Sequence, residues 1–126
     1  MNHFEILHTD AAPAAIGPYS QAVRAGSFLF TSGQIPLTPD GQMVAEDAQA
    51  QAKQVFSNLD AILVNAGATR SQVVKATVFV ADLADFDTIN KVYAEFFGDH
   101  RPARTTVQVA KLPRDAKVEI EVVALL

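Results

Sequence analysis

The chain of 126 residues contains no cysteine. Disulfide bonds, thiolate catalysis and cysteine-ligated metal sites are therefore excluded at once. The chain also lacks a long apolar run, and no stretch approaches the roughly 20 residues that a membrane-spanning helix requires. Its first ten residues, MNHFEILHTD, show neither a basic flank nor an apolar block, so we expect no secretory signal and a cytoplasmic location.

Positive charge is sparse and dispersed. Ten lysines and arginines stand against fourteen aspartates and glutamates, which gives a net charge of −4, and no two basic residues are adjacent. Nucleic-acid-binding proteins usually concentrate basic residues, because phosphate contacts supply most of their affinity. A nucleic acid is therefore an unfavoured partner. The three histidines have no metal-ligand spacing, and the sequence indicates neither a metal nor a cofactor.

Length and composition predict a single domain over residues 1–126. Hydrophobic residues make up 49% of the chain and charged residues 19%, which is the balance of an ordinary globular protein. No internal repeat or low-complexity linker divides it.

Two amphipathic helices are predicted. Over residues 48–66 apolar side chains recur at spacings of three and four, and Gly67 follows where a helix-ending glycine would stand. A second stripe covers residues 84–97. Asp82 or Asp85 is its candidate N-cap, and Gly98 would end it.

Strands are predicted on both sides of these helices. The opening HFEILH has the character of a short strand, and Gly26 is expected to close a hairpin. The order β-β-α-β-α-β-β favours an α+β fold in which two helices cover one face of a single mixed sheet. The principal predicted strands are residues 20–26, 27–35, 72–81, 104–110 and 117–125.

Such an architecture leaves the other face of the sheet bare. Strand 72–81 offers two largely apolar sets of alternating residues, one with Val74, Ala76, Val78 and Val80, the other with Val73, Thr77, Phe79 and Ala81. We expect a second copy of the chain to cover this face in a closed symmetric oligomer. The alternative is that the N-terminal hairpin folds across it.

Two charged residues near the end of the chain indicate a site. Arg104 heads one strand-like run, and Glu119 lies fifteen residues later within another. A guanidinium among apolar residues requires an anionic, forked partner. We therefore predict that Arg104 binds a small carboxylate and that Glu119 manages a proton or a water. The alternatives are a structural ion pair at Arg104 and a solvated face carrying Glu119 and Glu121.

Seven segments follow one another along the chain: AIGPYSQAV (15–23), FTSGQIP (30–36), the run from Asn58 to Gly67, the run from Val73 to Phe97, PAR (102–104), VQVAKLP (107–113) and VEIE (118–121). In this order they resemble the Rid (YjgF-type) family and, within it, the RidA subgroup of reactive intermediate deaminases. The resemblance extends from about residue 10 to residue 124.

The resemblance implies a fold, an assembly and an activity. The fold would be chorismate-mutase-like, and three copies would form a homotrimeric barrel with ligand clefts between subunits. The activity would be hydrolysis of 2-imino acids, such as 2-iminobutanoate and 2-iminopropanoate, to 2-oxo acids and ammonia. Pyridoxal-phosphate enzymes such as serine and threonine dehydratases release these imines.

The resemblance also implies residue roles. Arg104 would bind the substrate carboxylate and Glu119 would handle the water, without a metal or cofactor. Thr106 stands where some relatives have a cysteine. If that position acts through its backbone, threonine would serve as well, and if it acts through a thiol, this chain lacks the group. The remaining cleft residues would be Tyr19, Ser32, Gly33 and Asn90, although Tyr19 has an alternative role as a loop anchor and Asn90 as a capping or packing residue.

Two other functions stay open at this point. One is a regulatory or chaperone-like module that binds small carboxylates without turnover. The other is an endoribonuclease or translation inhibitor, a description given to animal members of the family, which the acidic charge of this chain disfavours.

Overall fold

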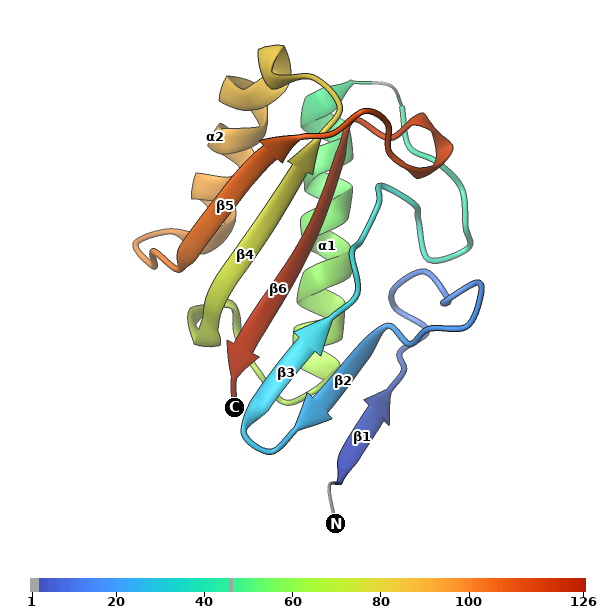
Figure 1. The fold of residues 1–126 in the computed structure, drawn as a ribbon, viewed down its shortest axis with the longest axis vertical. Helices are drawn as coiled ribbons and strands as arrows, with labels where there is room; N and C mark the ends of the chain where they lie inside the picture. Colours follow the sequence, from blue (N-terminus) through green and yellow to red (C-terminus); the bar gives the residue numbers. More distant parts are fainter. Residues whose placement is uncertain (1–2, 46) are drawn as a thin grey trace.

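A six-stranded sheet forms one layer of the structure and two helices form the other (Figure 1). The computed structural model describes residues 3–45 and 47–126. The predicted α+β architecture, with both helices on one face, is confirmed. The strands are β1 (Phe4–Leu7), β2 (Ala22–Ala25), β3 (Phe28–Thr31), β4 (Val73–Val80), β5 (Ala103–Gln108) and β6 (Val118–Leu125).

The sheet has the order β1-β2-β3-β6-β4-β5, and only β4 and β5 run parallel. The C-terminal strand β6 therefore lies in the middle, between β3 and β4. The opening residues form a sixth strand that pairs with β2, one more than the predicted order contained. Because β1, β2 and β3 extend the sheet sideways, the alternative in which the N-terminal hairpin covers the bare face is wrong.

Helix α1 (Ala48–Asn65) begins and ends as its sequence predicts. The Asp47 side chain accepts a hydrogen bond from the backbone N–H of Gln49 and caps the first turn. At the other end Gly67 has φ +79°, and the amide of Ala68 bonds back to the carbonyl of Leu63 at 2.9 Å. This is the Schellman arrangement, in which a left-handed residue closes the helix.

Helix α2 (Phe86–Phe97) lies beside α1 and is preceded by a short 3₁₀ turn, Leu83–Asp85. Asp82 caps that turn through the amide of Ala84, whereas Asp85 takes the N-cap position of α2 without a side-chain bond. The predicted start at residue 84 therefore falls in the 3₁₀ turn. Gly98, with φ +61°, ends the helix as predicted.

A β-bulge at the start of β4 changes which residues face the core. The pairing with β6 shifts between Val73 and Lys75, so Val73 is fully buried while Val74 is 41% exposed. The alternating pattern in the sequence predicts that Val74 and Ala76 point to the same face of the sheet. That prediction is wrong, because the bulge adds a residue to the strand.

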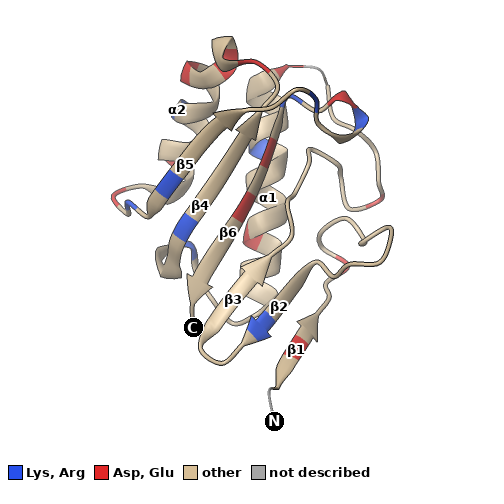
Figure 2. Cartoon of the chain, in the orientation of Figure 1, with Lys and Arg blue, Asp and Glu red and all other residues tan. Residues whose placement is uncertain are grey.

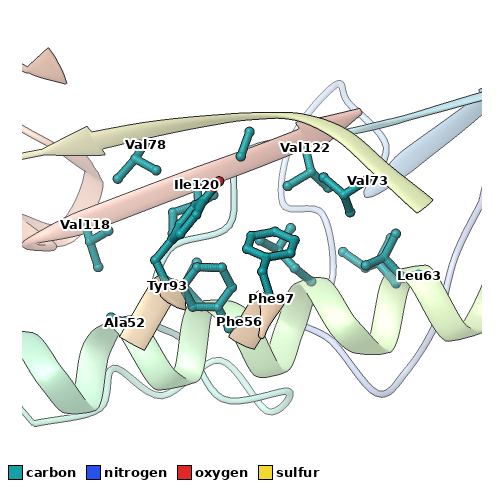
Figure 3. Packing of buried hydrophobic residues seen from close by; sticks show 14 of the residues in the cluster. Ala52, Phe56, Leu63, Val73, Val78, Tyr93, Phe97, Val118, Ile120 and Val122 are labelled. Atoms are coloured by element: carbon teal, nitrogen blue, oxygen red, sulfur yellow. The ribbon is translucent and has the colours of Figure 1, made fainter. Parts of the chain in front are cut away.

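The core lies between the sheet and the helices (Figure 3). Phe56 of α1 packs against three aromatic rings of α2, with the Phe96 ring centroid 4.5 Å away. The sheet contributes β-branched residues that the helices cover completely. They include Val78, Val118, Ile120 and Val122.

The opposite face of the sheet carries no helix and is mixed in character (Figures 1 and 2). On β6 it presents Glu119 and Glu121, and on β4 it presents Lys75 and Thr77. Phe30 of β3 is 46% exposed there. Lys75 makes the second face of β4 less apolar than the sequence predicts, although large apolar side chains do remain uncovered.

Candidate functional site

Arg104 lies on β5, the edge strand that runs beside β4. Its register partner is Ala76, whose side chain is fully buried on the helix-covered face. Register partners on neighbouring strands point to the same face of a sheet. Arg104 therefore projects on the helix side, at the edge where α2 passes.

The Arg104 guanidinium is held by α2 without a counterion. Its Nη1 donates a hydrogen bond of 2.6 Å to Oδ1 of Asn90, and its Cζ lies 4.7 Å from the ring centroid of Tyr93. Over residues 3–45 and 47–126, no carboxylate comes within 4.0 Å of it. The structural ion pair is therefore not found, and the charge remains available to an outside anion.

A hollow of about 520 Å³ opens beside this arginine. Its lining includes Asn90, Tyr93 and a second arginine, Arg101. Burial raises the pKa of the Tyr93 phenol, while the positive charges of Arg104 and Arg101 act in the opposite direction. In the sequence, Tyr93 is one member of the apolar stripe over residues 84–97 and does not stand out as a site residue. A tyrosine in an apolar stripe could have indicated a nearby site, because a buried tyrosine hydroxyl normally has a hydrogen-bond partner.

Two hydroxyl groups near this arginine are buried without a hydrogen-bond partner among the described residues. They are Oη of Tyr93 and Oγ1 of Thr106. Thr106 follows Arg104 by two positions on β5 and pairs in register with Val78, so it faces the same layer. The predicted backbone role of Thr106 is neither supported nor contradicted by this placement.

Glu119 lies on the opposite face of the sheet, on β6. It pairs in register with Phe79 and is half-buried. Burial raises the pKa of its carboxyl, and the negative charge of Glu121 on the same face raises it further. A carboxyl tuned in this way exchanges protons at a higher pH than an ordinary glutamate. The alternative of a fully solvated face does not describe Glu119.

Gly33 touches the Glu119 side chain. A Cβ at this position would collide with Oε2 of Glu119 and lie 2.9 Å from its Cδ. The amides on either side are occupied, since Ser32 N–H bonds to Gln21 O and Gln34 N–H bonds to Ile120 O, each at 2.9 Å. The Gly33 amide has no such partner within the described parts of the chain. It is therefore a free donor next to a carboxyl group.

Ser32 and Tyr19 complete this second region. The Ser32 hydroxyl donates to Ser20 O at 2.6 Å, so it fixes the loop rather than facing a ligand freely. The Tyr19 hydroxyl accepts a 3.4 Å bond from the Ile16 amide, which supports the loop-anchor role. Its ring nevertheless stays 55% exposed and shares a hollow with Gly33.

The predicted residues therefore fall into two groups. We call Asn90, Arg104 and Thr106 the arginine half-site, and Tyr19, Ser32, Gly33 and Glu119 the glutamate half-site. They lie on opposite faces of the sheet, and β4 separates β5 from β6. Two strand spacings amount to roughly 10 Å, so one small molecule cannot reach both half-sites of the same chain.

Residues 3–45 and 47–126 show neither a metal cluster nor a membrane-spanning helix. No three histidine, aspartate or glutamate side chains gather closely enough there to hold a metal ion. Neither helix in this part of the chain combines the length and apolarity needed to cross a membrane.

Comparisons with known proteins agree closely. The family model described as endoribonuclease L-PSP matches residues 9–126. The 2-iminobutanoate/2-iminopropanoate deaminase of Salmonella typhimurium is 52% identical over 122 residues, covering 94% of this chain and 95% of that protein. A Rid-family protein of unknown function, YyfA from Yersinia pestis, superposes with a TM-score of 0.96 at 44% identity, covering 98% and 100% of the two chains.

A third relative was solved with a small molecule. The structure of Escherichia coli TdcF with bound serine gives a TM-score of 0.92 at 50% identity, covering 97% of this chain and 98% of that one. Matches of this identity over nearly the whole of both chains leave no doubt about ancestry. The chain belongs to the endoribonuclease L-PSP family, and within that family to the Rid proteins.

Proposed function

We propose that this protein hydrolyses 2-imino acids to 2-oxo acids and ammonia. In the protonated form, R–C(=NH₂⁺)–COO⁻ and one water become R–CO–COO⁻ and NH₄⁺. The oxygen of water forms the new carbonyl, and the nitrogen leaves with the electron pair of the broken C–N bond. The observation that carries the proposal is the Arg104 guanidinium, which is exposed, oriented and without a carboxylate partner among the described residues.

Arg104 binds the substrate carboxylate in this mechanism. A guanidinium donates two parallel charge-assisted hydrogen bonds to a carboxylate, which fixes both position and orientation. Asn90 and the Tyr93 ring hold the guanidinium before the substrate arrives. This preorganisation reduces the entropy that binding must overcome.

Glu119 handles the proton of the attacking water. Its negative form stabilises the cationic iminium carbon, and it accepts a proton as the water adds. The raised pKa of its carboxyl makes it a stronger base toward that water, and the proton that it takes up is then at hand for the departing nitrogen. The free amide of Gly33 lies beside it and can donate to the oxygen on which charge develops.

The complete site forms between copies of the chain. Each copy presents the arginine half-site on one face and the glutamate half-site on the other, so a neighbour must supply the missing half. A homotrimer satisfies this requirement for every chain, because a repeated head-to-tail contact closes into a ring. Exposed apolar side chains on the bare face, such as Phe30 at 46% exposure, supply surface for that contact.

Relatives support this function. The Salmonella protein carries the name of the same activity at 52% identity, and TdcF was solved with serine, a molecule that bears a carboxylate. The same proposal places the protein in the cytoplasm, beside the pyridoxal-phosphate enzymes that release such imines.

A coupled assay tests the proposal. Purified protein is added to threonine dehydratase with semicarbazide, which traps free imine, and 2-oxobutanoate appearance is followed. The wild type should accelerate 2-oxo acid release, and Arg104→Ala should abolish the acceleration. Binding of 2-oxobutanoate without acceleration would favour the alternative of a binding module that does not turn substrate over.

A mixing experiment tests the shared site. Arg104→Ala and Glu119→Gln chains, each inactive alone, are co-expressed with different tags and purified as mixed assemblies. Some interfaces then unite an intact arginine with an intact glutamate, so activity should return. Mixed assemblies that stay as inactive as the parents would rule out a site made by two copies.

The family description also names ribonuclease activity, and this alternative has its own test. Nucleic-acid binding relies on concentrated positive charge, whereas this chain carries a net charge of −4 and presents Glu119 and Glu121 on its bare face. We expect no cleavage of single-stranded RNA and no salt-dependent gel shift. Cleavage that Glu119→Gln abolishes would support the ribonuclease instead.

A further inference from the structure

Two positive charges meet at the hollow beside Arg104. The lining of this hollow, which has a volume of about 520 Å³, includes the side chains of both Arg104 and Arg101. Arg104 belongs to the edge strand β5, and Arg101 belongs to the loop that connects α2 to β5 (Figure 2). Burial raises the pKa of the Tyr93 phenol and both charges oppose that rise, so both act at the same place.

Neither of these guanidinium groups is neutralised by the described part of the chain. Over residues 3–45 and 47–126, every ion pair within 4.0 Å joins other side chains. Asp99 lies in the same loop as Arg101 and is exposed, but it pairs with neither arginine. Two like charges beside each other destabilise the free protein, and a bound anion removes that cost. A single carboxylate compensates only one of the two charges.

The hydrogen bonds that the two guanidinium groups already make leave one edge of each group open. Arg101 donates through Nη1 to Gly98 O and, at 3.0 Å, to His100 O. Arg104 donates through Nη1 to Oδ1 of Asn90 at 2.6 Å. Among the described residues, the Nε and Nη2 groups of both arginines have no hydrogen-bond partner. Because Nε and Nη2 together can donate two parallel bonds to a carboxylate, each arginine can bind one acid group.

The loop that carries Arg101 is fixed before any ligand binds. Gly98 ends α2 with φ +61°, and the amide of His100 bonds back to the carbonyl of the last helical residue at 3.1 Å. The His100 ring donates through Nε2 to Val73 O at 2.6 Å, which ties the loop to the first residue of β4. Pro102 then restricts the backbone φ angle directly before β5. A loop that is held in this way loses little conformational entropy when a ligand binds.

The rest of the lining is largely carbon. It includes the buried rings of Tyr93 and Phe97, with Ala94 and Pro102 beside them (Figure 3). A volume of about 520 Å³ is within the range of small-molecule sites, which is roughly 300–1,000 Å³. A ligand with a short carbon chain and an acid group at each end matches such a lining, because its chain contacts carbon while each acid group contacts an arginine.

We propose that this hollow binds ligands with two acid groups, one on Arg104 and the other on Arg101. For turnover, the inference rests on the proposed function, and it assigns the protein 2-imino dicarboxylic acids such as the imine formed when glutamate is oxidised. The carboxylate next to the imine binds Arg104, and the carboxylate at the far end of the chain binds Arg101. Arg101 is then the residue that determines specificity, because a substrate without the second carboxylate leaves its charge uncompensated.

The test compares two substrates that differ by one acid group. 2-Iminoglutarate and 2-iminopentanoate have carbon chains of the same length, and L-glutamate oxidase and L-amino acid oxidase produce them from glutamate and norvaline. For each imine kcat/KM is measured with semicarbazide as the competing trap. Arg101→Gln removes the charge, and Arg101→Lys keeps the charge without the two parallel bonds. Arg24→Gln, at an exposed position of β2, removes one positive charge elsewhere and is the matched control.

The expected result is a change in the ratio of the two kcat/KM values. Wild type and Arg24→Gln should favour 2-iminoglutarate, Arg101→Gln should lower the ratio at least about tenfold, and Arg101→Lys should give an intermediate ratio. A wild-type preference for 2-iminopentanoate, an unchanged ratio in Arg101→Gln, or an equal fall in Arg24→Gln would overturn the proposal. Because Arg101 also bonds to the end of α2, melting curves accompany the kinetics. If Arg101→Gln does not fold, the ratio in Arg101→Lys against wild type decides.

Failure of the proposed function gives a different result. The wild type would then accelerate hydrolysis of neither imine, and calorimetric titration with 2-oxoglutarate and 2-oxopentanoate would test the hollow by binding alone. Tighter binding of 2-oxoglutarate by wild type, with the difference lost in Arg101→Gln, would support the dicarboxylate site and reject only the hydrolase. Equal affinity of wild type for the two acids would reject the site itself.

Discussion

Gly33 and Glu119 are packed so closely that a Cβ at residue 33 would force the Glu119 side chain to shift. The φ angle of Gly33 is not in the left-handed region, unlike those of five other glycines among the described residues. Its requirement for glycine therefore comes from the neighbouring carboxyl group rather than from the backbone. Residue 33 therefore needs to be glycine for the position of the Glu119 side chain and not for the backbone conformation.

Gly33→Ala should leave the fold intact and impair catalysis. The added methyl group displaces the Glu119 carboxyl, and a misplacement of about 1 Å in a reacting group costs on the order of 10²-fold in kcat. Steady-state kinetics together with a melting curve would show this pattern. Gly26→Ala is the opposite control: Gly26 has φ +60° and an open Cβ position, so its substitution should cost about 1 kcal/mol of stability and no activity.

Arg104→Lys should weaken substrate binding although it keeps the positive charge. Lysine cannot donate two parallel bonds to one carboxylate, and its ammonium replaces the flat group that stacks on Tyr93. We expect a loss of about tenfold or more in kcat/KM and in affinity for 2-oxobutanoate. Arg24→Lys, at an exposed position of β2, should change neither quantity, and an equal effect of the two substitutions would contradict the role of Arg104.

Glu121→Gln should move the acid limb of the pH–rate profile to lower pH. Burial and the Glu121 charge both raise the pKa of Glu119, and this substitution removes only the second. The Glu119 carboxylate then persists to lower pH, so kcat should be retained under more acidic conditions than in the wild type. Lys75, which lines a hollow with Glu121, should be left unchanged in the experiment. An unmoved acid limb would show that Glu121 has no influence on the reacting carboxyl.

Tyr93→Phe should not destabilise the protein. The phenol oxygen is buried without a partner among the described residues, and an unsatisfied buried hydroxyl costs roughly 1–3 kcal/mol. Phenylalanine removes that cost and retains the ring beneath Arg104. Chemical denaturation should therefore give a free energy of unfolding equal to or above that of wild type, whereas Tyr93→Leu should lower both stability and kcat/KM. A clear loss of stability in Tyr93→Phe would reveal a bonded hydroxyl.

The helices and their ends could be predicted from sequence because their causes are local. The glycines at 67 and 98 and the three- and four-residue apolar spacing define α1 and α2 without reference to distant residues. The bulge beside Val74 could not be predicted, since it depends on pairing with β6, whose place in the sheet is a tertiary property.

The candidate site was predictable as a set of residues but not as an arrangement. Arg104 and Glu119 were identified by their chemistry and by the family resemblance. Their placement on opposite faces of the sheet depends on how β4 pairs with β5 and with β6, which the sequence does not specify. Tyr93 was missed as a site residue, because its significance arises only when α2 passes Arg104.

The division of the predicted residues between two faces has a consequence for cells that make both normal and altered copies. In the proposed shared site, a chain without Arg104 would still supply an intact Glu119 to its neighbour, and a chain without Glu119 would still supply an intact Arg104. One defective allele would thus reduce the number of active sites in proportion to its share of the chains, without inactivating every assembly that contains a defective chain.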